Sequence, residues 1–183
     1  MVDLQIWLVR VLPSVAAVGD LMRTAWAWPM AESLHFIGLT MLIGTVGLFD
    51  LRLLGVARGI PAAALHRLAP YGIAGFALCV GTGAMFLMTE PDQYIYNPSF
   101  HYKVLFMAGA GVNASIFYST SYRAALVQGE GLPVPPHYKW IGLVSLVLWM
   151  LVIVTGRLLT FYRPFPCAPE PTGLLATCSP GFR

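Results

Sequence analysis

The sequence contains few charged side chains. Only 10% of its 183 residues are Asp, Glu, Lys or Arg, whereas 57% are hydrophobic. A soluble domain carries roughly 25% charged residues, so this chain lacks the polar side chains that would cover a surface facing water. We therefore expect an integral membrane protein with one bundle of spanning helices and no additional soluble catalytic domain.

Basic stretches and catalytic motifs are also missing. The net charge is only +3, and no run of Lys and Arg exists that would attract nucleic acid. The sequence contains no HExxH, no CxxC and no glycine-rich phosphate loop, and it shows no nucleophile with a base. These absences exclude nucleic acid as a partner and favour a protein without independent catalytic activity.

Four segments are long and apolar enough to cross a membrane, which takes roughly 20 helical residues. They cover residues 34–54, 68–89, 100–122 and 140–162. A proline lies just upstream of each segment or at its approach, where a missing N–H is tolerated: Pro29, Pro61, Pro98 and Pro135 with Pro136. We predict an all-α, integral membrane four-helix bundle that forms one domain over residues 1–163.

The two ends of the chain differ from this pattern. Residues 4–15 place apolar side chains on one helical face, which predicts an amphipathic helix in the membrane interface, and a fifth crossing within residues 4–27 remains an alternative. The tail, residues 164–183, is rich in proline and contains Cys167 and Cys178. In an oxidising compartment these thiols would form a disulfide, although two free thiols are the alternative. A tail without helical periodicity also suggests a partner protein.

The distribution of Lys and Arg predicts the orientation. The loop at residues 90–99 contains no Lys or Arg, so we expect it to be the translocated loop. Basic residues flank the other two loops: Arg52, Arg58, Arg67, Arg123 and Lys139. This arrangement places both chain ends, including the tail, on the periplasmic side of a bacterial inner membrane.

Small residues at four-residue spacing predict where helices approach closely, because lipid provides no hydrophobic force between them. Such stripes also make room for a flat cofactor, although helix contact is the commoner role. Three segments carry a stripe: Thr40 and Gly44; Gly75, Cys79 and Gly83; Gly111, Ser115 and Ser119.

The four histidines lie near the starts of the four segments. Because the helices alternate in direction, His35 and His101 fall on the outer side, each roughly 13 Å from the midplane at about 1.5 Å of rise per residue. His66 and His137 fall on the inner side, in the headgroup zone. Two imidazoles from facing helices can hold a b-type haem, so His35 and His101 are the candidate ligands, with interfacial histidines as the simpler alternative.

Two cations lie at a depth similar to that of the outer histidines. Lys103 and Arg157 are candidates for haem propionates, and Arg157 is the better one, because Lys103 is two residues from His101 and points to another face. Ion pairing with Glu32, Glu90 or Asp92 is the alternative. Copper is a further possibility for His35 and His101, because Met85 and Met88 lie at a similar height.

Two other polar residues fall inside the predicted crossings. Asp50 lies near the inner end of the first crossing, where a proton relay is conceivable but an ion pair is favoured. Its expected partners are Arg58, Arg123 and Lys139. Asn113, near the middle of the third crossing, predicts an interhelical hydrogen bond.

Three stretches carry a family resemblance: WPMAESLHFIGLTMLIGTVGLFDLRLLG (residues 28–55), YIYNPSFHYKVLFMAGAGVNASIFY (94–118) and SLVLWMLVIVTGR (145–157). The chain resembles an uncharacterised family of bacterial inner-membrane proteins. More remotely it is similar to CopD-type copper-resistance proteins and four-helix protoporphyrinogen oxidases, although ESLH replaces the basic motif usual before their histidine. That resemblance implies equivalent roles for His35 and Lys103 and an association with copper or haem.

The preferred interpretation is a small b-type cytochrome-like protein that takes part in electron transfer with a membrane partner or quinone. A cofactor-free accessory subunit of a larger energy-converting complex is the second interpretation, and copper handling is the third.

Overall fold

The computed structural model describes residues 16–57, 59–127 and 134–161, which form helices and connecting turns with no strand among them. Each of the four predicted segments lies almost entirely within one of the four long helices, and short helices lie between them. In chain order the helices are α2 (Ala16–Met22), α3 (Ala27–Leu54), α4 (Ala62–His66), α5 (Ala69–Thr89), α6 (Pro91–Ile95), α7 (Pro98–Thr120), α8 (Tyr122–Val127) and α9 (Pro136–Phe161).

Prolines occupy the first turns of the long helices, and α3 and α9 therefore begin earlier than predicted. Pro98 and Pro136 are the first residues of α7 and α9. At this position the N–H that proline lacks would have no intrahelical partner, so no hydrogen bond is lost. Pro29 lies in the first turn of α3 for the same reason. At the start of α7, the Asn97 side chain accepts a hydrogen bond from the Ser99 N–H at 3.0 Å, which caps the helix.

Gly55 ends α3 in a left-handed conformation, with φ at 87°. Its N–H donates to the carbonyl of Arg52, and the Val56 N–H donates to the carbonyl of Leu51. This pair of bonds is the Schellman motif, which satisfies carbonyls that a helix end leaves open.

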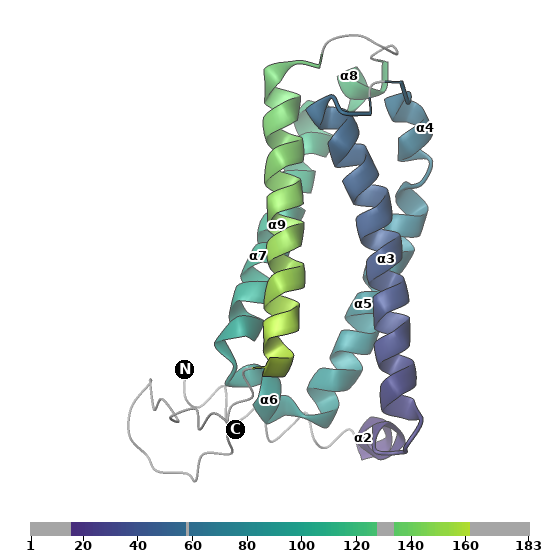
Figure 1. Cartoon of the computed structure of the whole chain (residues 1–183), viewed down its shortest axis with the longest axis vertical. Helices are drawn as coiled ribbons and strands as arrows, with labels where there is room; N and C mark the ends of the chain where they lie inside the picture. Colours follow the sequence, from purple (N-terminus) through teal and green to yellow (C-terminus); the bar gives the residue numbers. More distant parts are fainter. Residues whose placement is uncertain (1–15, 58, 128–133, 162–183) are drawn as a thin grey trace.

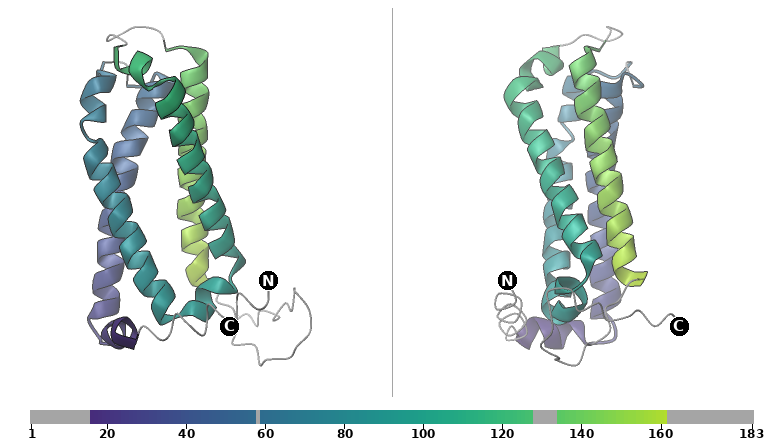
Figure 2. Two further views of the ribbon diagram at one scale, coloured as in Figure 1. Left: turned by 180° about the vertical axis from the view of Figure 1, so that it is seen from behind. Right: turned by 90° about the vertical axis from the view of Figure 1, so that its left-hand side faces the viewer.

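The long helices alternate in direction and lie side by side as two pairs (Figure 1). Helix α3 packs on α5, α7 packs on α9, and contacts between α3 and α9 join the two pairs. Figure 2 shows α5 and α7 standing apart on the face opposite to this junction. Helices α2 and α6 lie at one end of the molecule, and α4 and α8 lie at the other.

Glycines set the closest approaches between helices. A Cβ at Gly38 of α3 would lie 2.8 Å from the carbonyl oxygen of Gly75 on α5. A Cβ at Gly142 of α9 would lie 2.9 Å from the backbone carbonyl oxygen of Asp50 on α3. The stripe containing Gly75 and Cys79 therefore does face a helix, as predicted. The predicted α3 stripe, Thr40 and Gly44, is exposed and does not contact α5. Helix α3 is rotated so that Gly38 faces α5 instead.

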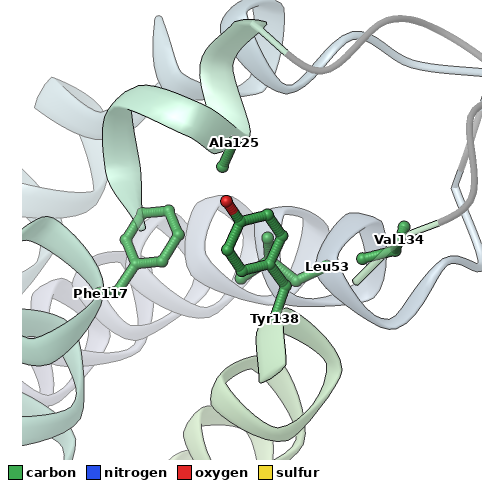
Figure 3. Packing of buried hydrophobic residues seen from close by; sticks show 5 residues of the cluster. All are labelled: Leu53, Phe117, Ala125, Val134 and Tyr138. Atoms are coloured by element: carbon green, nitrogen blue, oxygen red, sulfur yellow. The ribbon is translucent and has the colours of Figure 1, made fainter. Parts of the chain in front are cut away.

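Buried apolar side chains gather at the two ends of the molecule. One cluster joins α3, α7, α8 and α9 at the α4 and α8 end (Figure 3): Leu53, Phe117, Ala125, Val134 and Tyr138. Another joins α2 and α3 at the opposite end: Met22, Ala27 and Ala31. Between the ends, large apolar side chains point outward, among them Ile73 at 69% and Leu105 at 62% exposure, as expected for helices surrounded by lipid.

Three helical stretches in the described part of the chain are long and apolar enough to cross a membrane: Ala27–Leu54, Ala62–Thr89 and Pro136–Phe161. Helix α7 is also long enough but is less apolar, because it carries His101, Lys103, Asn113 and several hydroxyl side chains. The predicted amphipathic helix at residues 4–15 and the tail with Cys167 and Cys178 lie outside the described residues. Residues 16–26 form α2 and a turn before α3 begins.

Candidate functional site

His35 is held between α3 and α5 by a hydrogen bond that fixes its tautomer. The ring Nδ1 lies 2.8 Å from Oγ1 of Thr82, and the same hydroxyl donates to the carbonyl of Leu78 at 2.7 Å. Because the hydroxyl proton is used in that bond, Oγ1 accepts from the Nδ1–H of His35. With Nδ1 protonated, the lone pair of the imidazole is on Nε2, and the ring also interacts with the backbone of Cys79. An imidazole oriented in this way is typical of a metal ligand.

The close packing of α3 on α5 positions this histidine. Because Gly38 and Gly75 have no side chains, the two helices come close enough for the Cys79 thiol to lie 3.4 Å from the carbonyl oxygen of His35. Next to the ring, Phe86 of α5 contacts His35 with 6.0 Å between ring centroids. The sequence alone did not identify Thr82 as a partner, because its helical position becomes meaningful only once the register between α3 and α5 is known.

Lys103 enters the same region from α7. Its side chain lies against Gly156 of α9, where a Cβ would be 3.6 Å from Nζ. The ammonium is close enough to His35 and Cys79 to interact electrostatically with both. No carboxylate pairs with Lys103 in the described part of the chain, so the alternative ion pairs with Glu32 and Glu90 are not formed there, and the Asp92 side chain lies outside the described residues. Lys103 thus lies within electrostatic range of His35.

The other two predicted site residues lie outside this cluster. His101 is exposed, and its nearest ring neighbour is Phe100. Successive helical residues are about 100° apart, so His101 and Lys103, which are two residues apart, point to nearly opposite faces of α7. Because Lys103 points inward, His101 points outward. Arg157 is also exposed and lies over the ring of Phe161 at 5.0 Å. The expected facing pair of His35 and His101 is therefore not assembled, and Lys103, rather than Arg157, is the cation beside His35.

The inner histidines do not form a pair either. His66 contacts Tyr118 through a hydrogen bond of 3.4 Å, and its ring packs on Tyr122. His137 is exposed and lies next to Tyr138. No group of three or more His, Cys, Asp or Glu side chains suited to a metal ion occurs in the described ranges, and Met85 packs against the apolar cluster around Met22.

A cavity of about 310 Å³ lies between the four long helices, toward the α4 and α8 end. Its walls are mostly apolar and aromatic, with Phe49, Phe76, Phe117 and Trp149 among them. Asp50 of α3 is the acidic residue of this lining. The Asp50 carboxylate is 4% exposed and accepts a hydrogen bond from Ser145 of α9.

Two of the expected partners of Asp50 do not pair with it: Arg123 and Lys139 are exposed and form no salt bridge with it, and the third, Arg58, lies outside the described residues. Among the residues that the structure describes, the Oδ2 atom of Asp50 is buried and has no hydrogen-bond partner. Asn113, in contrast, forms the predicted interhelical bond, because its Nδ2 donates to the carbonyl of Ile141 on α9 at 3.1 Å.

Comparisons of this chain with protein-family models, with curated proteins and with solved structures find no match. Because these comparisons find no match, the class of protein is indicated by the fold. The described residues are all helical, and three of their helical stretches are long and apolar enough to span a bilayer, as in a membrane protein. His35 and Lys103 lie toward one end of the helices, and the mostly apolar cavity that contains Asp50 lies toward the other.

Proposed function

We propose that the chain is a small b-type cytochrome-like protein of the bacterial inner membrane, which exchanges electrons with a membrane partner or quinone. The observation that carries this proposal is the state of His35, whose Nδ1–H is bound to Thr82 so that Nε2 presents a lone pair. Hydrogen bonding at the distal ring nitrogen orients and strengthens an imidazole ligand.

The residues around His35 fit a haem in part. If a haem binds, His35 would supply an imidazole ligand and the Lys103 ammonium would supply a positive charge for a propionate. The two side chains pack against glycines, since a Cβ at Gly83 would be 3.9 Å from the His35 ring and one at Gly156 would be 3.6 Å from the Lys103 Nζ atom. A haem, when bound, provides the one-electron chemistry. His101 does not fit as the second ligand with α7 in its present rotation.

The proposed membrane arrangement has α7 as a fourth crossing, since it lies alongside α9, antiparallel to it, over a similar length. The α4 and α8 end carries Arg67, Arg123 and Lys139, which supports a cytoplasmic position for that end. His35 and Lys103 would then lie toward the periplasm. The same proposal includes the family resemblance, which associates His35 and Lys103 with copper or haem.

The test is the visible absorption spectrum of the full-length protein, purified in mild detergent, in reduced and oxidised forms. We expect a Soret band that is lost in His35→Ala and retained in His101→Ala, with His137→Ala as the control for an exposed histidine. A wild-type protein without a Soret band would refute haem binding. Equal loss in His35→Ala and His101→Ala would instead restore the paired-histidine site. Metal analysis of the same samples tests copper.

An accessory role in a larger complex is the second candidate. One observation favours it: the small side chains of Gly111, Ser115 and Ser119 lie on the exposed surface of α7 rather than against another helix of this chain. Such a stripe permits close approach of a partner helix. Replacing Ser115 by Leu should then release this chain from a copurifying complex, while Ser33→Leu, on exposed α3 surface, should not.

A further inference from the structure

The cavity near Asp50 combines two features that point to a ligand. Its volume of about 310 Å³ is at the lower end of the range for small-molecule sites. The carboxylate in its wall has one oxygen, Oδ2, with no hydrogen-bond partner although the side chain is 96% buried. Leaving such an atom unsatisfied is unfavourable, so a buried orphan acceptor calls for a specific partner.

The shape of the cavity indicates the route of entry. Helix α5 packs on α3 and α7 packs on α9, so the side between α5 and α7 is not closed by a helix contact (Figure 2). Lining residues from both helices are exposed there, namely Ile73 at 69% and Tyr118 at 52%, together with Gly111. This opening lies along the lengths of the helices, so it faces the lipid rather than the water.

The lining also limits the chemistry of the occupant. Phe49, Phe76, Phe117 and Trp149 surround the space with aromatic rings, which pack favourably on another ring. No Lys or Arg lines the cavity, so an anionic molecule has no counter-charge. Oδ2 of Asp50, which has no hydrogen-bond partner among the described residues, would accept a hydrogen bond from a donor on the occupant.

We propose that this cavity binds a neutral aromatic alcohol dissolved in the membrane, of the phenol or quinol class, whose hydroxyl donates to Oδ2 of Asp50. Ser145 holds the other part of the carboxylate and thereby orients it. The inference does not depend on haem, because no residue of the His35–Lys103 cluster lines the cavity.

Binding can be measured with the full chain in lipid nanodiscs. The probe is a radiolabelled decyl-substituted hydroquinone, and its O,O-dimethyl ether lacks only the donors. We expect saturable binding of one hydroquinone per chain, with the ether about tenfold weaker, as for the loss of one buried hydrogen bond. Asp50→Leu should remove this difference, whereas Glu32→Gln, an exposed carboxylate on the same helix, should preserve it.

A second pair of variants tests the location without touching Asp50. Gly111 has open space where its side chain would be, so Gly111→Phe fills the mouth of the cavity and should abolish hydroquinone binding. Gly81→Phe, at an equally open position outside the cavity, is the matched control. Binding should persist in His35→Ala, which separates this inference from the haem proposal.

Three results would overturn the inference. Equal affinity for the hydroquinone and its ether would show that Asp50 receives no donor. Unchanged discrimination in Asp50→Leu would place the site elsewhere. Binding no greater than the partitioning of hydroquinone into protein-free nanodiscs would mean that the cavity holds only water.

Discussion

The backbones of α3 and α5 touch at Gly38 and Gly75. A Cβ on Gly75 would lie 2.5 Å from the carbonyl oxygen of Gly38 and 2.8 Å from the backbone nitrogen of Leu42. Both neighbours are backbone atoms, so neither can move aside without shifting a helix. The His35–Thr82 hydrogen bond lies in the same helix pair and depends on this approach.

We therefore expect Gly75→Ala to destabilise the protein by about 1–3 kcal/mol, the usual effect of overpacking. The measurement is thermal or denaturant unfolding in detergent, followed by circular dichroism. Gly81→Ala on the same helix meets open space and should be neutral or slightly stabilising, because alanine favours the helix. Similar stability of Gly75→Ala and Gly81→Ala would contradict the close approach of α3 and α5.

Thr82→Val should release the His35 ring while keeping nearly the same side-chain volume. The valine has no hydroxyl to accept the Nδ1–H, so the tautomer is no longer fixed. Nitrogen NMR of the imidazole should show one dominant tautomer in the wild type and a mixture in the variant. If His35 binds haem, the affinity should fall by about 10–100-fold.

Thr82→Ser is the matched control for this experiment, because serine keeps the hydroxyl and should retain both the single tautomer and the affinity. A wild-type spectrum that already shows mixed tautomers would contradict the assignment of Thr82 as the acceptor.

Lys103→Met should separate stability from function. The ammonium has no anionic partner in the described residues, and methionine has a similar length without the charge. We expect the unfolding midpoint to rise by about 2–4 °C, corresponding to roughly 1 kcal/mol in a chain of this size. Haem retention should decrease in the same variant, since the propionate partner is lost.

Lys139→Met, at an exposed position on α9, should leave the stability and haem retention unchanged. A lower unfolding midpoint in Lys103→Met would indicate that Lys103 has a stabilising partner instead.

Asn97 joins the start of α7 to the end of α9. Its side chain caps α7 through Ser99, and its Nδ2 lies 3.5 Å from the carbonyl oxygen of Leu159. Asn97→Ala should reduce the free energy of unfolding by about 1–2 kcal/mol through loss of the cap. Asn97→Asp keeps the cap but not the amide donor, so an intermediate loss is expected. Equal stability of all three proteins in denaturant unfolding would show that this junction is not structurally important.

The helices were predictable because their signals are local. A run of some twenty apolar residues with a proline at its start specifies a long helix whatever surrounds it, and α3, α5, α7 and α9 cover the predicted segments. Even the bond from Asn113 to another helix followed from its polarity at mid-span. The capping role of Asn97, just before Pro98, was also visible in the sequence but was not used.

The site was less predictable because it depends on the rotation of each helix about its axis. Spacing along α7 placed His101 and Lys103 on different faces but did not show which face is inward. The structure turns Lys103 toward Gly156 and leaves His101 exposed. Asp50 likewise had plausible cationic partners in sequence, yet its actual neighbours are Ser145 and a cavity.

Composition by itself thus indicated a helical membrane protein, because a surface with so few charged side chains is suited to lipid rather than to water. Tertiary structure alone decided which polar groups meet. The contacts of Gly38 with Gly75 and of Gly142 with Asp50 set how α3, α5 and α9 are turned. A rotation of a single residue step, about 100°, would exchange an interior side chain for one that faces lipid.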